Sequence, residues 1–230
     1  MSAKSVRAPA PPLRVAVLVS GRGSNLQALI DARARGDLGI DIVAVASNKP
    51  GCAALQRATA AGIATVALDP AAFPDRPAFD RALFAALAEH APDLLVLAGF
   101  MRILDAGALE AWPGPMINIH PSLLPRHPGL HTHARALAAG DRAHGASVHR
   151  VIPALDAGPV LAQVRIDLAA DDTPATVAAR LLPREHALLC ASVALFAQRR
   201  VAFSAAGIQI DGGTLGAPLQ LGAEIGRAHV

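Results

Sequence analysis

The chain has 230 residues, of which 53% are hydrophobic and 17% charged, and its formal net charge is +3. This length and apolar content are typical of a globular domain with a full core and exclude a largely disordered chain. The basic residues are scattered, which argues against a nucleic-acid-binding protein, and no apolar run approaches the roughly 20 residues of a membrane-spanning helix.

The first half of the chain alternates between predicted strands and predicted helices. Apolar, β-branched runs predict strands at Leu13–Val19, Ile40–Ala46, Ile63–Leu68, Asp93–Ala98 and Met116–Ile119. Helical patterns between them predict helices at Leu26–Ala34, Gly51–Ala61 and Arg76–His90. Because these strands are apolar throughout rather than alternating, we expect an α/β fold with a mostly parallel, Rossmann-like sheet and helices on both faces.

The second half of the chain has a different pattern. It predicts a short helix, two strands, a long helix and a terminal hairpin, at Leu130–Ala139, Ala146–Ile152, Pro159–Ile166, Ala175–Gln198 and Val201–Ile210. Thr173 and Pro174 suit the N-cap and first position of the long helix, and Pro183 predicts a kink inside it. We expect these later strands to be partly antiparallel. Residues 13–210 are predicted to form one domain, followed by a C-terminal tail at 211–230.

The residues before the first strand are rich in Ala, Pro and Ser, and residues 1–12 are predicted to be a disordered leader. The short apolar run that follows contains Arg14, which indicates a strand rather than a secretory signal. Cys52 and Cys190 lie far apart without C-x-x-C spacing, so we expect free thiols. These features favour a cytoplasmic protein.

A glycine turn, Ser20-Gly21-Arg22-Gly23-Ser24-Asn25, follows the first predicted strand. Glycines allow several backbone N–H groups to point into one concavity, and the next helix N-terminus adds positive potential, so the turn suits a phosphate group. It lacks the third glycine of a dinucleotide fingerprint and the Lys-Ser/Thr of a P-loop. The alternative is a plain strand-to-helix turn with Ser24 as N-cap.

A second polar segment, Asn118-Ile119-His120-Pro121-Ser122-Leu123-Leu124-Pro125, follows an apolar run. Alternation at a strand end points Asn118 and His120 to the same side. An amide donor beside an imidazole suits stabilisation of a developing oxyanion with proton transfer nearby. The two prolines fix the backbone. Taken alone, the segment favours a plainer interpretation, a strand end with a capping Asn and a solvated His.

Asp156, in the turn Leu155–Pro159, is the third candidate. A carboxylate near His120 would raise the pKa of the imidazole and orient its ring, whereas the alternative is a solvated turn residue before Gly158. The other histidines have no thiolate or carboxylate partner with zinc-like spacing, so we expect no metal site. They include His127, His131, His133, His144 and His149.

Further segments carry a family resemblance together with these motifs. The full set is Ser20–Asn25, Asn48, Leu97–Leu104, Asn118–Pro125, Pro128–His133, Gly145–His149 and Leu155–Pro159. With colinear spacing from about Leu13 to the terminal hairpin, it resembles the phosphoribosylglycinamide formyltransferases. The Asn-x-His-Pro segment with a downstream Asp is common to formyltetrahydrofolate-dependent enzymes. The glycine turn and the Gly-Leu-His-Thr-His stretch are more specific to the glycinamide ribonucleotide branch.

The resemblance implies that a monomer or homodimer transfers a formyl group from 10-formyltetrahydrofolate to the amino group of glycinamide ribonucleotide in de novo purine synthesis. The implied catalytic residues are Asn118 and a protonated His120, which donate to the oxyanion, and Asp156, which keeps His120 charged. The implied substrate-binding residues are Gly21, Arg22, Gly23, Ser24, Asn25 and Glu185. The implied folate-binding residues are Arg76, Met101, Arg102, Ile103, Leu104 and Asn118.

Departures from the family pattern are few, and alternatives remain. Arg126 and His127 replace a commoner Lys-Tyr pair, which puts the substrate contacts there in question. A formyltetrahydrofolate hydrolase shares the catalytic residues but usually carries an N-terminal regulatory domain. A methionyl-tRNA formyltransferase needs an RNA-binding C-terminal domain, and chain length and the glycine turn disfavour a sugar-nucleotide formyltransferase. A non-catalytic nucleotide- or folate-binding module would not need Asn118, His120 and Asp156 together.

Overall fold

The computed structural model describes residues 11–205 and 207–222. The predicted leader therefore lies almost wholly outside the described residues, and so does the end of the predicted tail, at 223–230. Within the described part of the chain, no helix is both long and apolar enough to cross a membrane.

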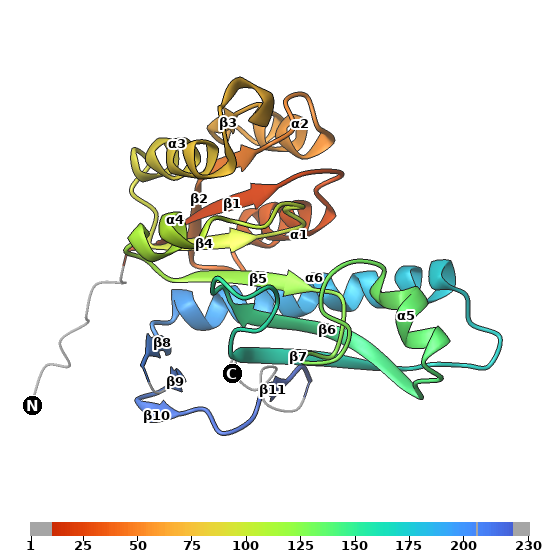
Figure 1. Ribbon diagram of the computed structural model, residues 1–230. Helices are drawn as coiled ribbons and strands as arrows, with labels where there is room; N and C mark the ends of the chain where they lie inside the picture. The colour runs from red at the N-terminus through yellow and green to blue at the C-terminus, as the bar shows by residue number, and fades with distance from the viewer. Residues whose placement is uncertain (1–10, 206, 223–230) are drawn as a thin grey trace, which may run out of the picture.

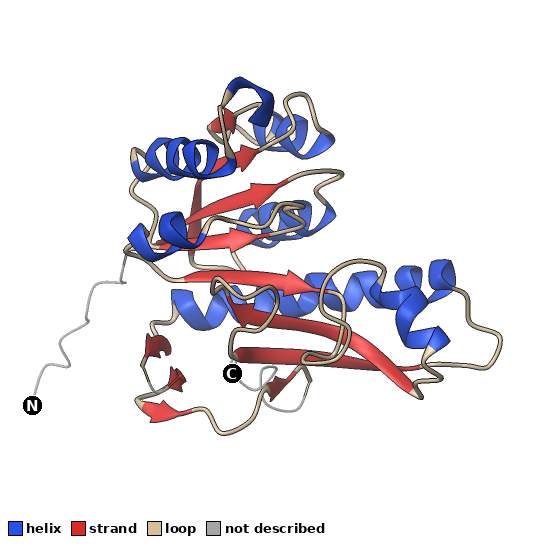
Figure 2. Ribbon diagram, viewed as in Figure 1, coloured by secondary structure: helices blue, strands red, loops and turns tan. Residues whose placement is uncertain are grey.

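An eight-stranded sheet forms the centre of the molecule, in the order β11-β7-β6-β5-β4-β1-β2-β3 (Figures 1 and 2). The strands are β1 (Leu13–Val19), β2 (Ile40–Ser47), β3 (Thr65–Ala67), β4 (Leu94–Leu97), β5 (Met116–His120), β6 (Ala143–Arg150), β7 (Val160–Asp167) and β11 (Leu219–Gln220). β1 to β5 pair in parallel, and β6 is antiparallel to both of its neighbours. The mostly parallel sheet with partly antiparallel C-terminal strands is thus confirmed.

Helices cover both faces of this sheet (Figure 1). Val15, Val17 and Val19 of β1 belong to the core on the face of α1 (Ser24–Ala34), α2 (Ala53–Ala60) and α6 (Pro174–Ala197). Ala16 and Leu18, which alternate with them, belong to the core under α3 (Arg76–Ala88) and α4 (Ala106–Ala111). A strand with apolar residues on both faces must be covered twice, which is why this sequence folds as a three-layer α/β domain.

The remaining elements lie toward the C-terminal half. α5 (Thr132–Ala138) packs against α6 and β6. A small antiparallel sheet contains β8 (Val201–Ser204), β9 (Gly207–Ile210) and β10 (Gly213–Thr214), so the predicted terminal hairpin is present. β11 then returns to pair with β7 in the main sheet, within the segment predicted as a tail.

α6 contains Pro183 and begins with a capping box between Thr173, the expected N-cap, and Thr176. The sequence pattern missed α4, β10, β11 and the 3-10 turn at Pro70–Ala72, because each is too short to show a period.

The strand order determines where the functional residues meet. β1, β4 and β5 are neighbours, so their carboxyl ends share one edge of the sheet. The glycine turn follows β1, Gly99 follows β4, and Asn118 and His120 belong to the last residues of β5. Ligands of parallel α/β sheets bind outside this edge.

Candidate active site

Asn118 and His120 lie on β5, two residues apart and on the same side of the strand, as the alternation predicts. His120 is 6% exposed. Its Nδ1 lies 3.4 Å from Oδ2 of Asp156, which comes from the loop between β6 and β7. Asp156 has a left-handed backbone with φ 49°, and its Oδ2 accepts a hydrogen bond from the Gly129 N–H at 2.8 Å. The structure therefore brings all three predicted catalytic residues to one place.

The ionisation of His120 depends on opposing effects of burial, hydrogen bonding and charge. Burial lowers the pKa of His120 most strongly, while its hydrogen bond to the His127 carbonyl and the charge of Asp156 raise it. The net pKa is below the ordinary value of 6.5. Removing the ring from water thus outweighs the nearby carboxylate, so the resting ring is the neutral form, and the protonated form implied by the resemblance stays a prediction for the reaction.

Asp156 itself is charged at neutral pH. Burial raises its pKa, but the His149 ring at 3.5 Å, the hydrogen bond from the Gly129 N–H and the interaction with His120 outweigh that effect and leave the pKa below its usual value. A negative carboxylate next to a neutral imidazole prepares Nδ1 of His120 to take up a proton.

His149 is a member of this cluster that the sequence interpretation placed only on a strand. Antiparallel pairing sets it opposite Asn118. Its Nδ1 lies 2.9 Å from the Arg150 carbonyl, which only accepts, so the hydrogen-bond network assigns the ring proton to Nδ1. The Asn118 amide donates to Nε2 at 3.0 Å, which leaves its second N–H for a ligand. His149 therefore orients Asn118.

A cavity of about 80 Å³ joins these groups to the predicted folate strip. Its lining includes Asn118, His149 and Asp156 together with Arg102, Ile103 and Leu104. Two predicted folate residues do not line it. Met101 is 62% exposed, although its backbone N–H donates to Ser20 Oγ at 2.8 Å, and Arg76 begins α3.

The glycine turn is shaped by its neighbours rather than by a serine cap. Gly23, with φ 73°, is the N-cap of α1, and among the described residues no side chain caps this helix. Ser24 is therefore the first helical residue and not the N-cap. A Cβ on Gly23 would lie 2.6 Å from Cβ of Ala54, so the close packing of α2 also requires glycine. The uncapped N–H groups remain available to an anion.

Glu185 of α6 lies beside this turn. It is 7% exposed, and burial raises the pKa of its carboxyl to about 7, although the hydrogen bond with the Asn25 side chain lowers it. Oδ1 of Asn25 is buried without a partner in the described part of the chain. The predicted phosphate turn and Glu185 thus form one polar patch at the sheet edge.

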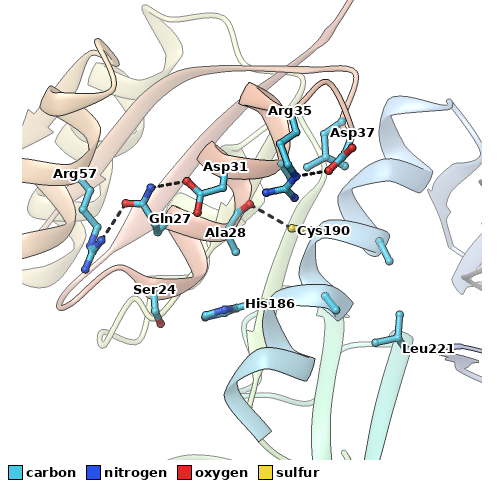
Figure 3. A pocket seen from close by; sticks show the side chains of 14 residues that line it. Ser24, Gln27, Ala28, Asp31, Arg35, Asp37, Arg57, His186, Cys190 and Leu221 are labelled. Carbon is cyan, nitrogen blue, oxygen red and sulfur yellow. Dashed lines mark hydrogen bonds and ion pairs between the residues drawn. The ribbon is translucent and has the colours of Figure 1, made fainter. Parts of the chain in front are cut away.

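A larger cavity, of about 590 Å³, lies between α1 and α6 (Figure 3). Its lining includes Ser24, His186 and Cys190 but none of the catalytic trio. Figure 3 shows Arg35 paired with Asp37 at 2.7 Å, and Asp31 and Arg57 each hydrogen-bonded to Gln27. The predicted catalytic residues therefore lie at the smaller cavity beside Asn118 and not at this one.

Three of the remaining histidines, His127, His133 and His144, make polar contacts. His133 Nδ1 lies 3.0 Å from His144 Nε2, and His127 pairs with Asp141. Among the residues that the structure describes, no group of three or more His, Cys, Asp or Glu is arranged to hold a metal ion.

Comparison with known proteins gives the family. The formyl transferase family model matches residues 13–193. The phosphoribosylglycinamide formyltransferase of Escherichia coli is 44% identical over 200 residues, covering 87% of this chain and 94% of that protein. The corresponding Mycobacterium tuberculosis enzyme is 42% identical, with 84% and 89% covered. The solved phosphoribosylglycinamide formyltransferase of Coxiella burnetii superposes with a TM-score of 0.87 at 42% identity, covering 91% of this chain and 99% of that one.

These similarities extend over most of each chain, and the solved structure has the same fold. The chain belongs to the formyl transferase family, among the phosphoribosylglycinamide formyltransferases.

Proposed function

We propose that this protein transfers the formyl group of 10-formyltetrahydrofolate to the amino group of glycinamide ribonucleotide, a step of de novo purine synthesis. The observation that carries the proposal is the cavity in which Asn118 and Asp156, in contact with His120 and His149, meet the strip Arg102–Leu104. An apolar wall beside an oxyanion donor and a proton acceptor suits acyl transfer from a folate.

The proposed reaction begins when the substrate amine attacks the formyl carbon. A carbon–nitrogen bond forms, and the formyl oxygen becomes an oxyanion that accepts from the free N–H of Asn118. The amine proton passes to Nδ1 of His120, directly or through water, and Asp156 stabilises the resulting imidazolium. Collapse of the intermediate breaks the bond between the carbon and the folate nitrogen, which takes the proton back from His120.

We assign binding of the ribonucleotide and of the folate to two separate regions beside the catalytic residues. The ribose phosphate would bind at Gly21–Asn25, where α1 presents uncapped N–H groups, and the glycinamide part would lie near Glu185. The folate would occupy the strip Met101–Leu104, with Arg76 near its outer end. Ser20 supports both regions, because its hydroxyl accepts from the Met101 N–H at 2.8 Å and donates to Asn48 at 2.5 Å.

We also propose a domain organisation and a cellular location for the protein. Residues 13–210 are assigned as one catalytic domain. The proposed location is the cytoplasm, where thiols stay reduced; Cys52 and Cys190 are both free in the structure.

The test is release of the folate product from 10-formyltetrahydrofolate with glycinamide ribonucleotide present or omitted. Transfer predicts product only when the ribonucleotide is present. Equal release without it would instead establish a formyltetrahydrofolate hydrolase and contradict the proposal.

A further inference from the structure

The second ring nitrogen of His120 has a partner that the reaction described above does not use. Nε2 lies 3.0 Å from the backbone carbonyl of His127, in the loop between β5 and α5. A carbonyl only accepts, so Nε2 carries the hydrogen in the neutral ring. The Asp156 carboxylate is also only an acceptor, but its Oδ2 lies farther away, at 3.4 Å from Nδ1. The shorter contact therefore assigns the hydrogen to Nε2 and leaves Nδ1 unprotonated. The His127 carbonyl thereby decides which His120 atom accepts the substrate proton.

The backbone that supplies this carbonyl is held in an uncommon conformation. His127 has φ 52°, in the left-handed region, which non-glycine residues adopt at some cost. Its ring Nε2 lies 2.7 Å from Oδ2 of Asp141, in the short turn between α5 and β6. The Asp141 side chain is 5% exposed and that of His127 is 12% exposed, so water competes little for this bond.

Other contacts show that Asp141 fixes the whole loop. Arg126 also pairs with this carboxylate, from a largely exposed position. The hydrogen bond from His127 is the main cause that holds the pKa of Asp141 below its usual value, which keeps the carboxylate charged. Ser122 Oγ donates to the Arg126 carbonyl at 2.7 Å, and two residues beyond His127 the Gly129 N–H donates to Asp156. One loop therefore contacts both His120 and its carboxylate partner.

We propose that His127 and Asp141 form a positioning pair that holds the His127 carbonyl against His120 and fixes the Nε2–H tautomer of the catalytic imidazole. Neither side chain touches the reacting atoms in this assignment, so both act through His120. The inference rests on the proposed function for its catalytic consequence, but the tautomer itself is a property of the unliganded protein. Arg126 and His127 are also where this chain departs from the commoner Lys-Tyr pair.

The test compares variants of the full chain. His127→Phe keeps the ring volume and the backbone carbonyl but removes the donor to Asp141, whereas His127→Gln keeps a terminal N–H donor. Arg126→Ala is the matched control, since it removes the exposed partner of the same carboxylate. Long-range proton–nitrogen NMR spectra of the unliganded protein identify the protonated nitrogen of His120, and formyl-transfer kinetics supply kcat and KM.

The positioning pair predicts a single Nε2–H tautomer in the native protein and in Arg126→Ala. It predicts a mixture of tautomers in His127→Phe with a fall in kcat of roughly 10- to 100-fold, since small misplacements of a catalytic group have effects of this size, and little change in KM. His127→Gln should recover most of both properties. A purely structural role would lower the melting temperature without changing the tautomer.

An unchanged tautomer in folded His127→Phe would overturn the inference, and so would an equal change in Arg126→Ala. If His127→Phe does not fold, Asp141→Ala tests the same bond from its other end, with the same expected mixture and the same contradicting result. Because the spectra need no substrate, a change of tautomer in a protein that shows no transfer would contradict the proposed function alone.

Discussion

At the residue scale, burial has more influence on the site chemistry than charge pairing has. The family resemblance implied that Asp156 belongs with His120, and the two are 3.4 Å apart. It could not give the sign of the net pKa shift, because desolvation depends on how completely β5, β6 and their loops enclose the ring. The enclosed ring is neutral at physiological pH, which suits a proton acceptor better than a permanent cation.

The first prediction concerns the charge of Asp156. Asp156→Asn removes a charge that raises the pKa of His120, so this pKa, already below 6.5, should fall further while turnover is nearly abolished. NMR titration of His120 measures the shift, and Asp37→Asn, which changes an exposed carboxylate away from the site, is the control. A pKa of His120 that stays the same or rises would show that Asp156 does not act on it as a charge.

The second prediction concerns the oxyanion donor. Asn118→Asp keeps the shape of the side chain but replaces its NH2 group by an acceptor, and Asn118→Ala removes the group altogether. Losing one such donor typically lowers kcat by about 10²- to 10³-fold. Steady-state kinetics and a binding titration with the ribonucleotide should show lost turnover with binding largely kept. A kcat close to that of the native enzyme in either variant would remove Asn118 from the mechanism.

The third prediction follows from Glu185, whose pKa is raised by burial from 4.5 to about 7. The folded state holds a proton that the unfolded state releases between these values, so the free energy of unfolding falls as pH rises through this window. The loss reaches about 3 kcal/mol above pH 7. Glu185→Gln removes this dependence. Urea unfolding should find the variant gaining stability relative to the native protein between about pH 4.5 and about pH 8, and parallel curves would contradict the buried, protonated carboxyl.

At the scale of elements, the loop between β6 and β7 depends on close backbone contact. A Cβ on Gly158 would lie 1.9 Å from the Arg150 carbonyl oxygen, so a side chain there would push the loop away from the strand end. The loop carries Asp156, which links this packing requirement to the reaction.

The fourth prediction tests that link. Gly158→Ala should reduce stability by about 1–3 kcal/mol, the usual cost of overpacking, and should lower kcat because Asp156 moves away from His120. Gly39→Ala is the matched control, since nothing lies within 4 Å of its added Cβ. The measurements are the denaturant midpoint and kcat of both variants. Equal values for Gly158→Ala and Gly39→Ala would mean that the loop accommodates the added Cβ without moving Asp156.

The helices and strands that could be predicted from the sequence are those with a strong hydrophobic periodicity. β1 matches its predicted range, because its apolar run is bounded by a charged strand start and a glycine turn. The alternative with Ser24 as the N-cap of α1 does not hold, because the N-cap is Gly23, whose close approach to Ala54 of another helix cannot be read from the sequence. β11 could not be predicted, since two residues carry no period and their pairing with β7 is a tertiary effect.

At the scale of the whole molecule, the order of strands assembles the site from distant segments. The family resemblance implied that Asn118, His120 and Asp156 belong to one site, and the fold brings the three side chains together. The sequence interpretation missed His149, whose role follows from the register that sets it opposite Asn118. It also missed the link from Asp141 through His127 to His120. Strand periodicity tells which face a side chain takes but not which residue of another strand lies opposite, so these partners required the fold.

The most direct measurement follows an isotopically labelled formyl group of 10-formyltetrahydrofolate through one reaction mixture that contains the enzyme and glycinamide ribonucleotide. The proposed function predicts that the label appears on the ribonucleotide amine at the rate at which the folate product forms, and that Asp156→Asn abolishes both. Label released as free formate at that rate, with the ribonucleotide unmodified, would contradict it.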